Sequence, residues 1–272
     1  MADDFIMGSE TYTPQMGGMS TKGTQKLLNI FFVVDISGSM RSEGRIHAVN
    51  EAFTQMVPAF RQVQLDCMSE LELRIAIMTF DETARWIVAP TPILEYNHEE
   101  IDCSQWVTYF SRAFRTLVDK LTRSEYMAHS GKIAQPYIML MTDGEPTKED
   151  DYKPELNKLL ENGWFKSAQR FAVLIGRDTI NSPSARAAVE KFVSNTTEGI
   201  INAADAAAIA AEVQAKTIHT VVNMTKHNVI DDLGGSSEGG SEGGFGDFGE
   251  GGFGGDFGGF GDFGGFDDGS FI

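Results

Sequence analysis

Between residues 26 and 228 the chain alternates short apolar runs with longer segments of helical pattern, and this alternation restricts the possible folds more than any other feature. Strands that are separated by helix-length segments predict a mostly parallel sheet with helices on both faces. Six strands and five helices are expected. The strands are predicted at 28–35, 71–80, 84–89, 137–142, 170–176 and 199–202, and the helices near 43–62, 105–127, 152–164, 183–195 and 205–222.

The second and third predicted strands are an exception to this pattern. Only Asp81, Glu82 and Thr83 separate them, which is too short a connection for a helical crossover. These two strands should therefore form an antiparallel hairpin at one edge of the sheet. The predicted fold is an α/β fold with a doubly wound, mostly parallel six-stranded sheet and one antiparallel edge strand.

The two ends of the chain differ from this globular part. Residues 1–25 have no apolar period and are interpreted as a mobile arm. The last 39 residues contain 18 Gly, 8 Phe and 8 acidic residues and no basic residue. Ordering them would cost about 60 kcal/mol, whereas burying eight Phe returns about 20 kcal/mol. The segment 231–272 is therefore predicted to be a disordered acidic tail.

The net charge and the cysteine content limit the kinds of function that this chain can have. The net charge of -17 argues against a nucleic-acid partner, because phosphate binding relies on clustered Lys and Arg. The first residues lack the features of a secretory signal, and no run reaches the roughly 18 apolar residues of a membrane span. The only cysteines, Cys67 and Cys103, have no metal-ligand spacing. We expect a cytoplasmic protein with reduced cysteines that act as packing groups, and no membrane partner.

Oxygen-bearing side chains follow two of the predicted strands. Asp35, Ser37 and Ser39 come directly after the first strand, and Asp143 follows the strand at 137–142. Ligands of doubly wound sheets bind beyond the carboxyl ends of the strands, where the strand order reverses. These side chains are therefore candidate ligands of a divalent cation. The alternative is a purely structural role, with Asp35 as a helix cap, the serines as turn residues and Asp143 in an Asx-turn.

The order of these motifs resembles a known family. The Asp-x-Ser-x-Ser loop at 35–39, the Thr in the segment 106–111 and the Asp-Gly pair at 143–144 are similar to the metal-ion-dependent adhesion site of von Willebrand factor A domains. The segments 34–40, 48–51, 77–81 and 140–147 resemble the TerY-like branch, which is associated with tellurium resistance. The resemblance spans about 28–222, so the segment 26–230 is identified as one such domain.

The resemblance implies a set of metal ligands. Ser37, Ser39 and Thr108 would bind the cation directly, and Asp35 and Asp143 would bind it directly or through water. Ligation by oxygen alone suits Mg²⁺, with Mn²⁺ and Ca²⁺ as alternatives. The third loop departs from the family pattern of Gly-Gly-Thr-Pro-Leu-Gly, because this chain has Trp-Val-Thr-Tyr-Phe-Ser at 106–111.

Five ligands leave one coordination position open, and an acidic side chain of a partner could fill it. We therefore expect a non-enzymatic protein-binding module in a cytoplasmic stress-response or signalling complex, with a protein kinase or phosphatase as the partner that the family suggests. Gly-x-Ser-x-Gly, His-Glu-x-x-His and a complete P-loop are absent from the sequence. Candidate partner contacts are Trp106, Tyr109, Glu145, Phe266 and Phe271.

Two other functions are compatible with the sequence. The Phe-rich tail could drive self-association or multivalent assembly, so that the chain would act as a scaffold. A metal-dependent phosphohydrolase is the third hypothesis, and the lack of a general base near the ligand loops argues against it.

Overall fold

One six-stranded sheet forms the centre of the protein. The computed structural model describes residues 25–68, 70–204, 208, 211, 213 and 215–223. The strand order is β3-β2-β1-β4-β5-β6, with β3 antiparallel to β2 and the other pairs parallel. This confirms the predicted doubly wound sheet and its antiparallel edge strand. The strands are β1 (Lys26–Asp35), β2 (Leu71–Phe80), β3 (Ala84–Pro92), β4 (Tyr137–Thr142), β5 (Gln169–Ile175) and β6 (Ile200–Ala203).

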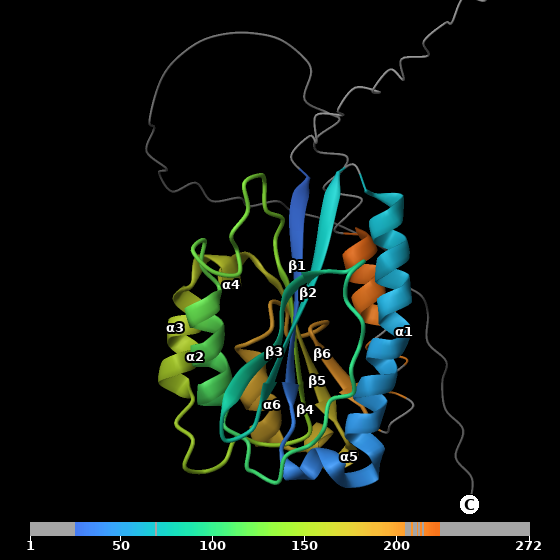
Figure 1. Cartoon of the computed structure of the whole chain (residues 1–272). Helices are drawn as coiled ribbons and strands as arrows, with labels where there is room; N and C mark the ends of the chain where they lie inside the picture. The colour runs from blue at the N-terminus through green and yellow to red at the C-terminus, as the bar shows by residue number, and fades with distance from the viewer. Residues whose placement is uncertain are drawn as a thin grey trace, which may run out of the picture. The chain divides into compact units, whose positions relative to one another are not determined.

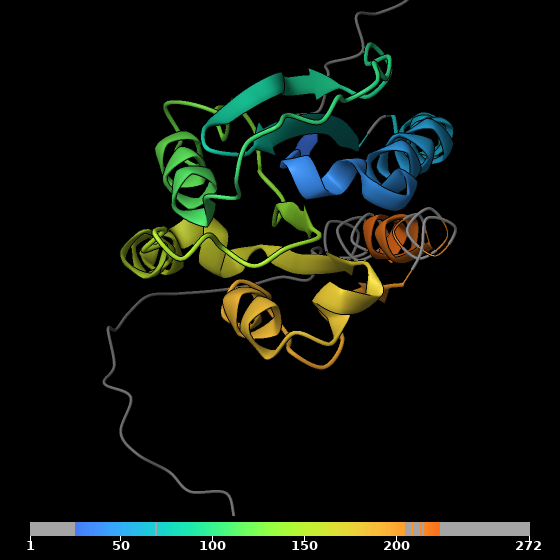
Figure 2. The ribbon, with the colours of Figure 1, turned by 90° about the horizontal axis from the view of Figure 1, so that it is seen from below.

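Helices cover both faces of this sheet. Figure 1 shows α1 and the helix at 215–223 on one side and α2 and α3 on the other, and Figure 2 shows the same layers from below. A short 3-10 helix, Gly38–Gly44, leads directly into α1. The helices are α1 (Arg45–Asp66), α2 (Phe110–Lys120), α3 (Lys153–Glu161), α4 (Gly163–Ser167), α5 (Arg177–Ile180) and α6 (Pro183–Glu190).

Three of the predicted helix ranges are wrong. The range 105–127 contains a helix only at Phe110–Lys120, because backbone hydrogen bonds to other loops hold the residues before it in a loop. The range 152–164 is two helices, since the Asn162 side chain accepts hydrogen bonds from the amides of Trp164 and Phe165 and starts a new helix there. The range 183–195 ends as a helix at Glu190. Helix α5 was not predicted.

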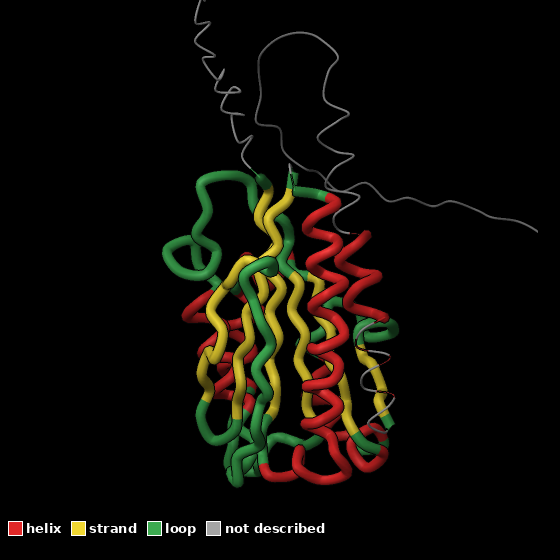
Figure 3. The backbone as a smooth tube through the Cα atoms, turned by 45° about the vertical axis from the view of Figure 1, so that its right-hand side comes forward, coloured by secondary structure: helices red, strands yellow, loops and turns green. Residues whose placement is uncertain are grey.

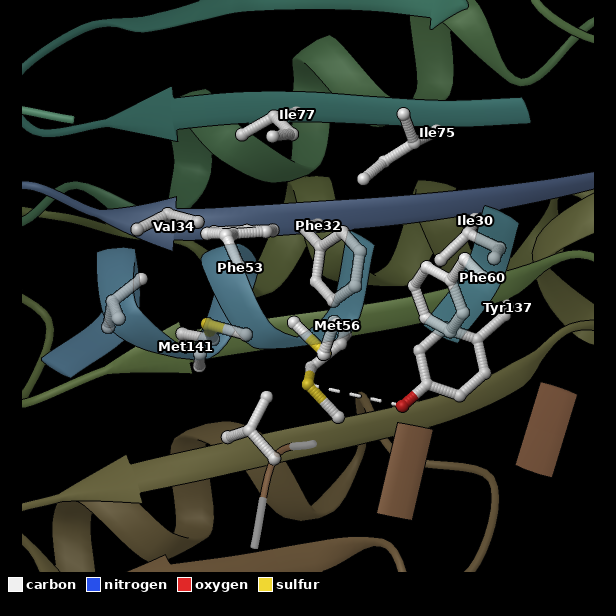
Figure 4. Packing of buried hydrophobic residues seen from close by; sticks show 14 of the residues in the cluster. Ile30, Phe32, Val34, Phe53, Met56, Phe60, Ile75, Ile77, Tyr137 and Met141 are labelled. Carbon is white, nitrogen blue, oxygen red and sulfur yellow. Dashed lines mark hydrogen bonds between the residues drawn. The ribbon is translucent and has the colours of Figure 1, made fainter. Parts of the chain in front are cut away.

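Two hydrophobic cores lie on the two faces of the sheet. The alternating side chains of β1 supply both, with Phe32 on one face and Phe31 on the other. Phe32 meets Phe53 of α1 edge to face, with ring centroids 4.9 Å apart, and Figure 4 shows how α1 packs on β1 and β4 through such contacts. Cys67 and Cys103 are free thiols that pack against this core, as predicted.

The strand order reverses between β1 and β4. The chain runs from β1 to β2 on one side and later returns to β4 on the other side of β1. Val34 pairs with Met141, so the next residues, Asp35 and Thr142, end neighbouring strands at the same edge. Figure 3 shows the loops that gather at this lower end of the sheet. The fold therefore brings the predicted ligand loops to one place.

The predicted arm and tail lie almost entirely outside the described residues, of which Gln25 is the first. Within the described part of the chain, no helix combines the length and the apolar character that crossing a membrane requires.

Candidate metal centre

Asp35 is fully buried at the end of β1. One carboxylate oxygen, Oδ1, accepts a hydrogen bond of 2.8 Å from the amide of Ser37, and Oδ2 accepts one of 2.7 Å from the Thr142 hydroxyl. The first bond closes a tight turn that directs the chain from the strand into the loop. Asp35 therefore shapes the loop and supplies negative charge beneath it.

The pKa of Asp35 reflects this position. Burial raises the pKa from 3.8 to about 6, hydrogen bonds from Thr142 and Ser37 partly oppose the rise, and the negative charge of Asp143 adds to it. A carboxylate that is buried in this way disfavours its own ionised form. A cation beside it would relieve that cost.

A row of three oxygen atoms lies above Asp35. The hydroxyl oxygens of Ser37 and Ser39 are 3.1 Å apart, and the Ser39 hydroxyl donates a hydrogen bond of 2.8 Å to Oδ1 of Asp143. Ser37 and Asp143 are both buried. The side chain of Ser37 does not cap the 3-10 helix that follows it, so its hydroxyl is available to the row. The structure thus brings together three of the predicted ligands.

Thr108 approaches the same place from a third loop. It is 6% exposed, and its carbonyl oxygen accepts a hydrogen bond of 3.0 Å from the amide of Thr147. Its hydroxyl lies beside Gly144, 3.8 Å from the position that a Cβ atom would take there. Within the described part of the chain the Thr108 hydroxyl has no hydrogen-bond partner, so it remains free to bind a ligand.

The oxygen spacings fit a small divalent cation. In an octahedral shell with metal–oxygen distances of about 2.1 Å, neighbouring oxygens lie about 3.0 Å apart. The two spacings of 3.1 and 2.8 Å match the edges of such a shell. No cluster of three His, Cys, Asp or Glu side chains is found among the described residues. The hydroxyls, together with the two carboxylates, are therefore the donor set that this site offers.

Sequence reasoning missed two residues that hold the carboxylates. Thr142 binds Asp35, and its place at the end of β4 was a usable signal. Arg45, the first residue of α1, donates a hydrogen bond of 2.6 Å from Nη1 to Oδ2 of Asp143. Nothing in the local sequence predicts this ion pair, because the two residues are 98 positions apart.

The predicted partner contacts have different surroundings. Trp106 is 61% exposed, and its carbonyl oxygen accepts a hydrogen bond of 3.0 Å from the amide of Gly38, so it lies beside the two serines. Tyr109 is partly buried, and its amide binds the carbonyl of Asp81. Glu145 is exposed and accepts a hydrogen bond from the Ser182 hydroxyl. The predicted contacts Phe266 and Phe271 lie outside the described residues.

Asp81 caps the loop between β2 and β3, because its Oδ1 accepts hydrogen bonds from the amide and the hydroxyl of Thr83, at 2.7 and 2.9 Å.

Several solved structures share this fold. The first is proximal thread matrix protein 1 from the mussel byssus, at 12% identity and a TM-score of 0.52, covering 73% of this chain and 47% of that one. The pilus adhesin SpaC from Lactobacillus rhamnosus GG has 14% identity, a TM-score of 0.55, and coverage of 73% and 31%. A von Willebrand factor type A protein from Catenulispora acidiphila has 15% identity, a TM-score of 0.50, and coverage of 72% and 42%.

The chain thus matches less than half the length of these three proteins. No family model matches the sequence, and no curated protein matches it. At identities this low the likeness concerns the fold alone, which this chain shares with the von Willebrand factor type A protein.

Proposed function

We propose that the protein is a non-enzymatic binding module that holds a divalent cation, with Mg²⁺ as the first candidate, and uses it to bind an acidic group of a protein partner. The observation that carries the proposal is the row of Ser37, Ser39 and Asp143 oxygens, spaced at 3.1 and 2.8 Å. One structure of the mussel protein, at 13% identity, is described as having a zinc-occupied adhesion-site motif. That description supports a divalent cation in general.

Each residue of the centre has a distinct task in this proposal. The hydroxyls of Ser37, Ser39 and Thr108 would hold the cation, and the carboxylates of Asp35 and Asp143 would balance its charge. The bound cation would supply a Lewis-acidic position for one further oxygen ligand. Thr142 and the Ser37 amide keep Asp35 in place, and the Gly38 amide keeps the third loop against the first.

The engagement of both carboxylates favours binding over hydrolysis. Asp35 accepts hydrogen bonds at both oxygens, and Asp143 accepts one from Ser39 and one from Arg45. A general base must have a free lone pair within reach of the water that it deprotonates. In this proposal both carboxylates act as ligands of the cation, so neither is assigned as a base, and a metal-dependent phosphohydrolase is the weaker hypothesis.

The resemblance to the TerY-like branch suggests the cellular setting. We propose a cytoplasmic stress-response complex of the tellurium-resistance kind, or a signalling complex, with a protein kinase or phosphatase as partner. Self-association through the acidic Phe-rich tail is a second candidate function, favoured by the eight Phe residues among the last 39 positions of the chain.

Thermal unfolding of the full chain with Mg²⁺ and with EDTA tests the cation site. At 100 times its dissociation constant the cation should add about 2.7 kcal/mol of stability, or about 5 to 11 °C in Tm. Asp143→Asn should lose this gain. Glu145→Gln is the matched control, because it removes the same charge from an exposed position two residues away. Equal melting curves in Mg²⁺ and EDTA for the parent chain would refute the proposal.

A further inference from the structure

A guanidinium group already occupies one side of the candidate metal centre. Nη1 of Arg45 lies 2.6 Å from Oδ2 of Asp143, and the Arg45 side chain is only 13% exposed while that of Asp143 is fully buried. Oδ1 of the same carboxylate receives the Ser39 hydroxyl. Asp143 is therefore shared between a permanent positive charge on one side and the row of ligand oxygens on the other.

The structure holds this arginine in a fixed place. Nη2 of Arg45 lies 3.3 Å from a carboxylate oxygen of Glu43, which is the second ion pair of the guanidinium. On its other side lies Gly176, where a Cβ atom would come within 2.9 Å of Nη2. Gly176 has a φ of 90°, a conformation that glycine adopts without strain. A side chain at position 176 would push the guanidinium away from Asp143.

We propose that Arg45 sets the charge of the loaded centre, and thereby weakens cation binding while it strengthens binding of the partner's acidic group. This inference rests on the proposed function and assigns Arg45 a role in positioning Asp143 and in selecting the ligand. It concerns a residue that belongs to none of the three ligand loops.

The charges of the centre show why both effects should occur. The two buried carboxylates and the Arg45 guanidinium, counted without the exposed Glu43, give a charge of -1, and a divalent cation brings the loaded centre to +1. Without Arg45 the same centre would be -2 when empty and neutral when loaded. A centre at +1 attracts a carboxylate into the open coordination position, whereas a neutral centre does so less strongly. The same positive charge of Arg45 lowers the affinity of the centre for the cation itself.

The size of each effect follows from Coulomb's law. A cation bound to the Asp143 carboxylate opposite Arg45 would lie about 6 Å from the guanidinium. At the dielectric constant of water the repulsion between charges of +2 and +1 at that distance corresponds to about a tenfold change in affinity. A partner carboxylate in the open coordination position would lie farther from Arg45, at about 8 Å, and would carry a single charge. Its affinity should change by about two- to threefold at the same screening.

Calorimetric titration of the full chain measures both affinities. The cation arm uses Mn²⁺ alone. The ligand arm uses Mn²⁺-loaded protein and the peptide acetyl-Gly-Asp-Phe-Gly-amide, which copies residues 261–264 of the chain. Arg45→Gln should bind Mn²⁺ about tenfold more tightly and the peptide about two- to threefold more weakly. A merely structural role of Arg45 would lower both affinities together, so the opposite signs identify the charge effect.

Two further variants keep the inference testable if Arg45→Gln folds poorly. Glu43→Gln removes the acidic partner of Arg45, and the Glu43 side chain is 71% exposed. This variant should bind Mn²⁺ more weakly and the peptide more tightly than the parent, by smaller factors than those of Arg45→Gln. Arg41→Gln is the matched control, because within the described part of the chain the hydrogen bonds of Arg41 go to the carbonyls of Cys103 and Ser104, at 3.2 and 3.4 Å, and not to a ligand carboxylate. It should leave the Mn²⁺ affinity within about twofold of the parent.

Three results have distinct meanings. Opposite shifts in Arg45→Gln, with Arg41→Gln unchanged, support the inference. In the second case the parent binds Mn²⁺, and Arg45→Gln and Glu43→Gln leave both affinities unchanged or shift the Mn²⁺ affinity and the peptide affinity in the same direction. Either result overturns the role of Arg45 and leaves the proposed function intact. A parent chain that binds no Mn²⁺ overturns the proposed function itself, and the inference with it.

Discussion

Replacing Asp35 with Asn should stabilise the cation-free protein at neutral pH, although it removes a charge from the metal centre. The reason lies in the burial of Asp35, which raises the pKa of its carboxyl from 3.8 to about 6. The folded protein therefore holds this proton more tightly than the unfolded chain does. Ionisation of Asp35 opposes folding, and an amide of the same shape escapes that cost.

The magnitude depends on pH in a defined way. The free-energy cost of ionising Asp35 in the folded protein is absent below pH 3.8, grows as the pH rises towards 6 and is complete above that value. A difference of about two pKa units corresponds to about 3 kcal/mol at pH 7 and about 1 kcal/mol at pH 4.5. The new amide can accept the Ser37 amide hydrogen bond and donate to the Thr142 hydroxyl, so both existing contacts have a replacement.

Urea unfolding in EDTA at pH 4.5 and pH 7 measures this difference. Asp35→Asn should exceed the parent by about 3 kcal/mol at pH 7, or about 6 to 12 °C in Tm, and the gap should shrink at pH 4.5. With Mg²⁺ the order should reverse or narrow, because only the parent gains the cation. A variant that is no more stable than the parent at pH 7 in EDTA, or a gap that does not depend on pH, would refute the reasoning.

Two further predictions concern the third loop and the core. Thr108→Val should weaken cation binding at least tenfold, because loss of even an outer-shell contact typically costs about 10- to 100-fold in metal affinity. Its stability in urea with EDTA should stay within about 0.5 kcal/mol of the parent, since the hydroxyl has no hydrogen-bond partner in the described part of the chain. A large loss of stability in EDTA would show a structural role. Phe53→Ala should lower the free energy of unfolding by about 3 to 5 kcal/mol, because Phe53 is fully buried against Phe32 and its ring stacks on His98. A loss below about 1 kcal/mol in urea unfolding would contradict this packing.

The sheet could be predicted because its signals are local. Each strand is a short apolar run, and three residues between β2 and β3 require a hairpin. The ligand loops could be located for the same reason, since Asp35 and Asp143 follow buried strands directly. The register that places Val34 beside Met141 then brings both carboxylates to one edge.

The parts that were missed depend on contacts between distant segments. Arg45 reaches Asp143 only because Gly176 leaves room for its guanidinium, and no local pattern records this. The start of α2 was misplaced because the amide of Tyr109 binds the carbonyl of Asp81, which keeps Thr108 in a loop. That error matters for function, since a loop can bring the Thr108 hydroxyl beside Gly144 whereas the predicted helix would have fixed it elsewhere.

The central claim is that three loops hold one divalent cation, and a crystal structure of the full chain grown with Mn²⁺ tests it most directly. An anomalous difference map should show one strong peak within about 2.3 Å of the Ser37 and Ser39 hydroxyl oxygens, with the Thr108 hydroxyl in the same shell and the peak absent in Asp143→Asn. A map with no peak at these hydroxyls, or with Mn²⁺ bound only to other carboxylates of the chain, would contradict the account.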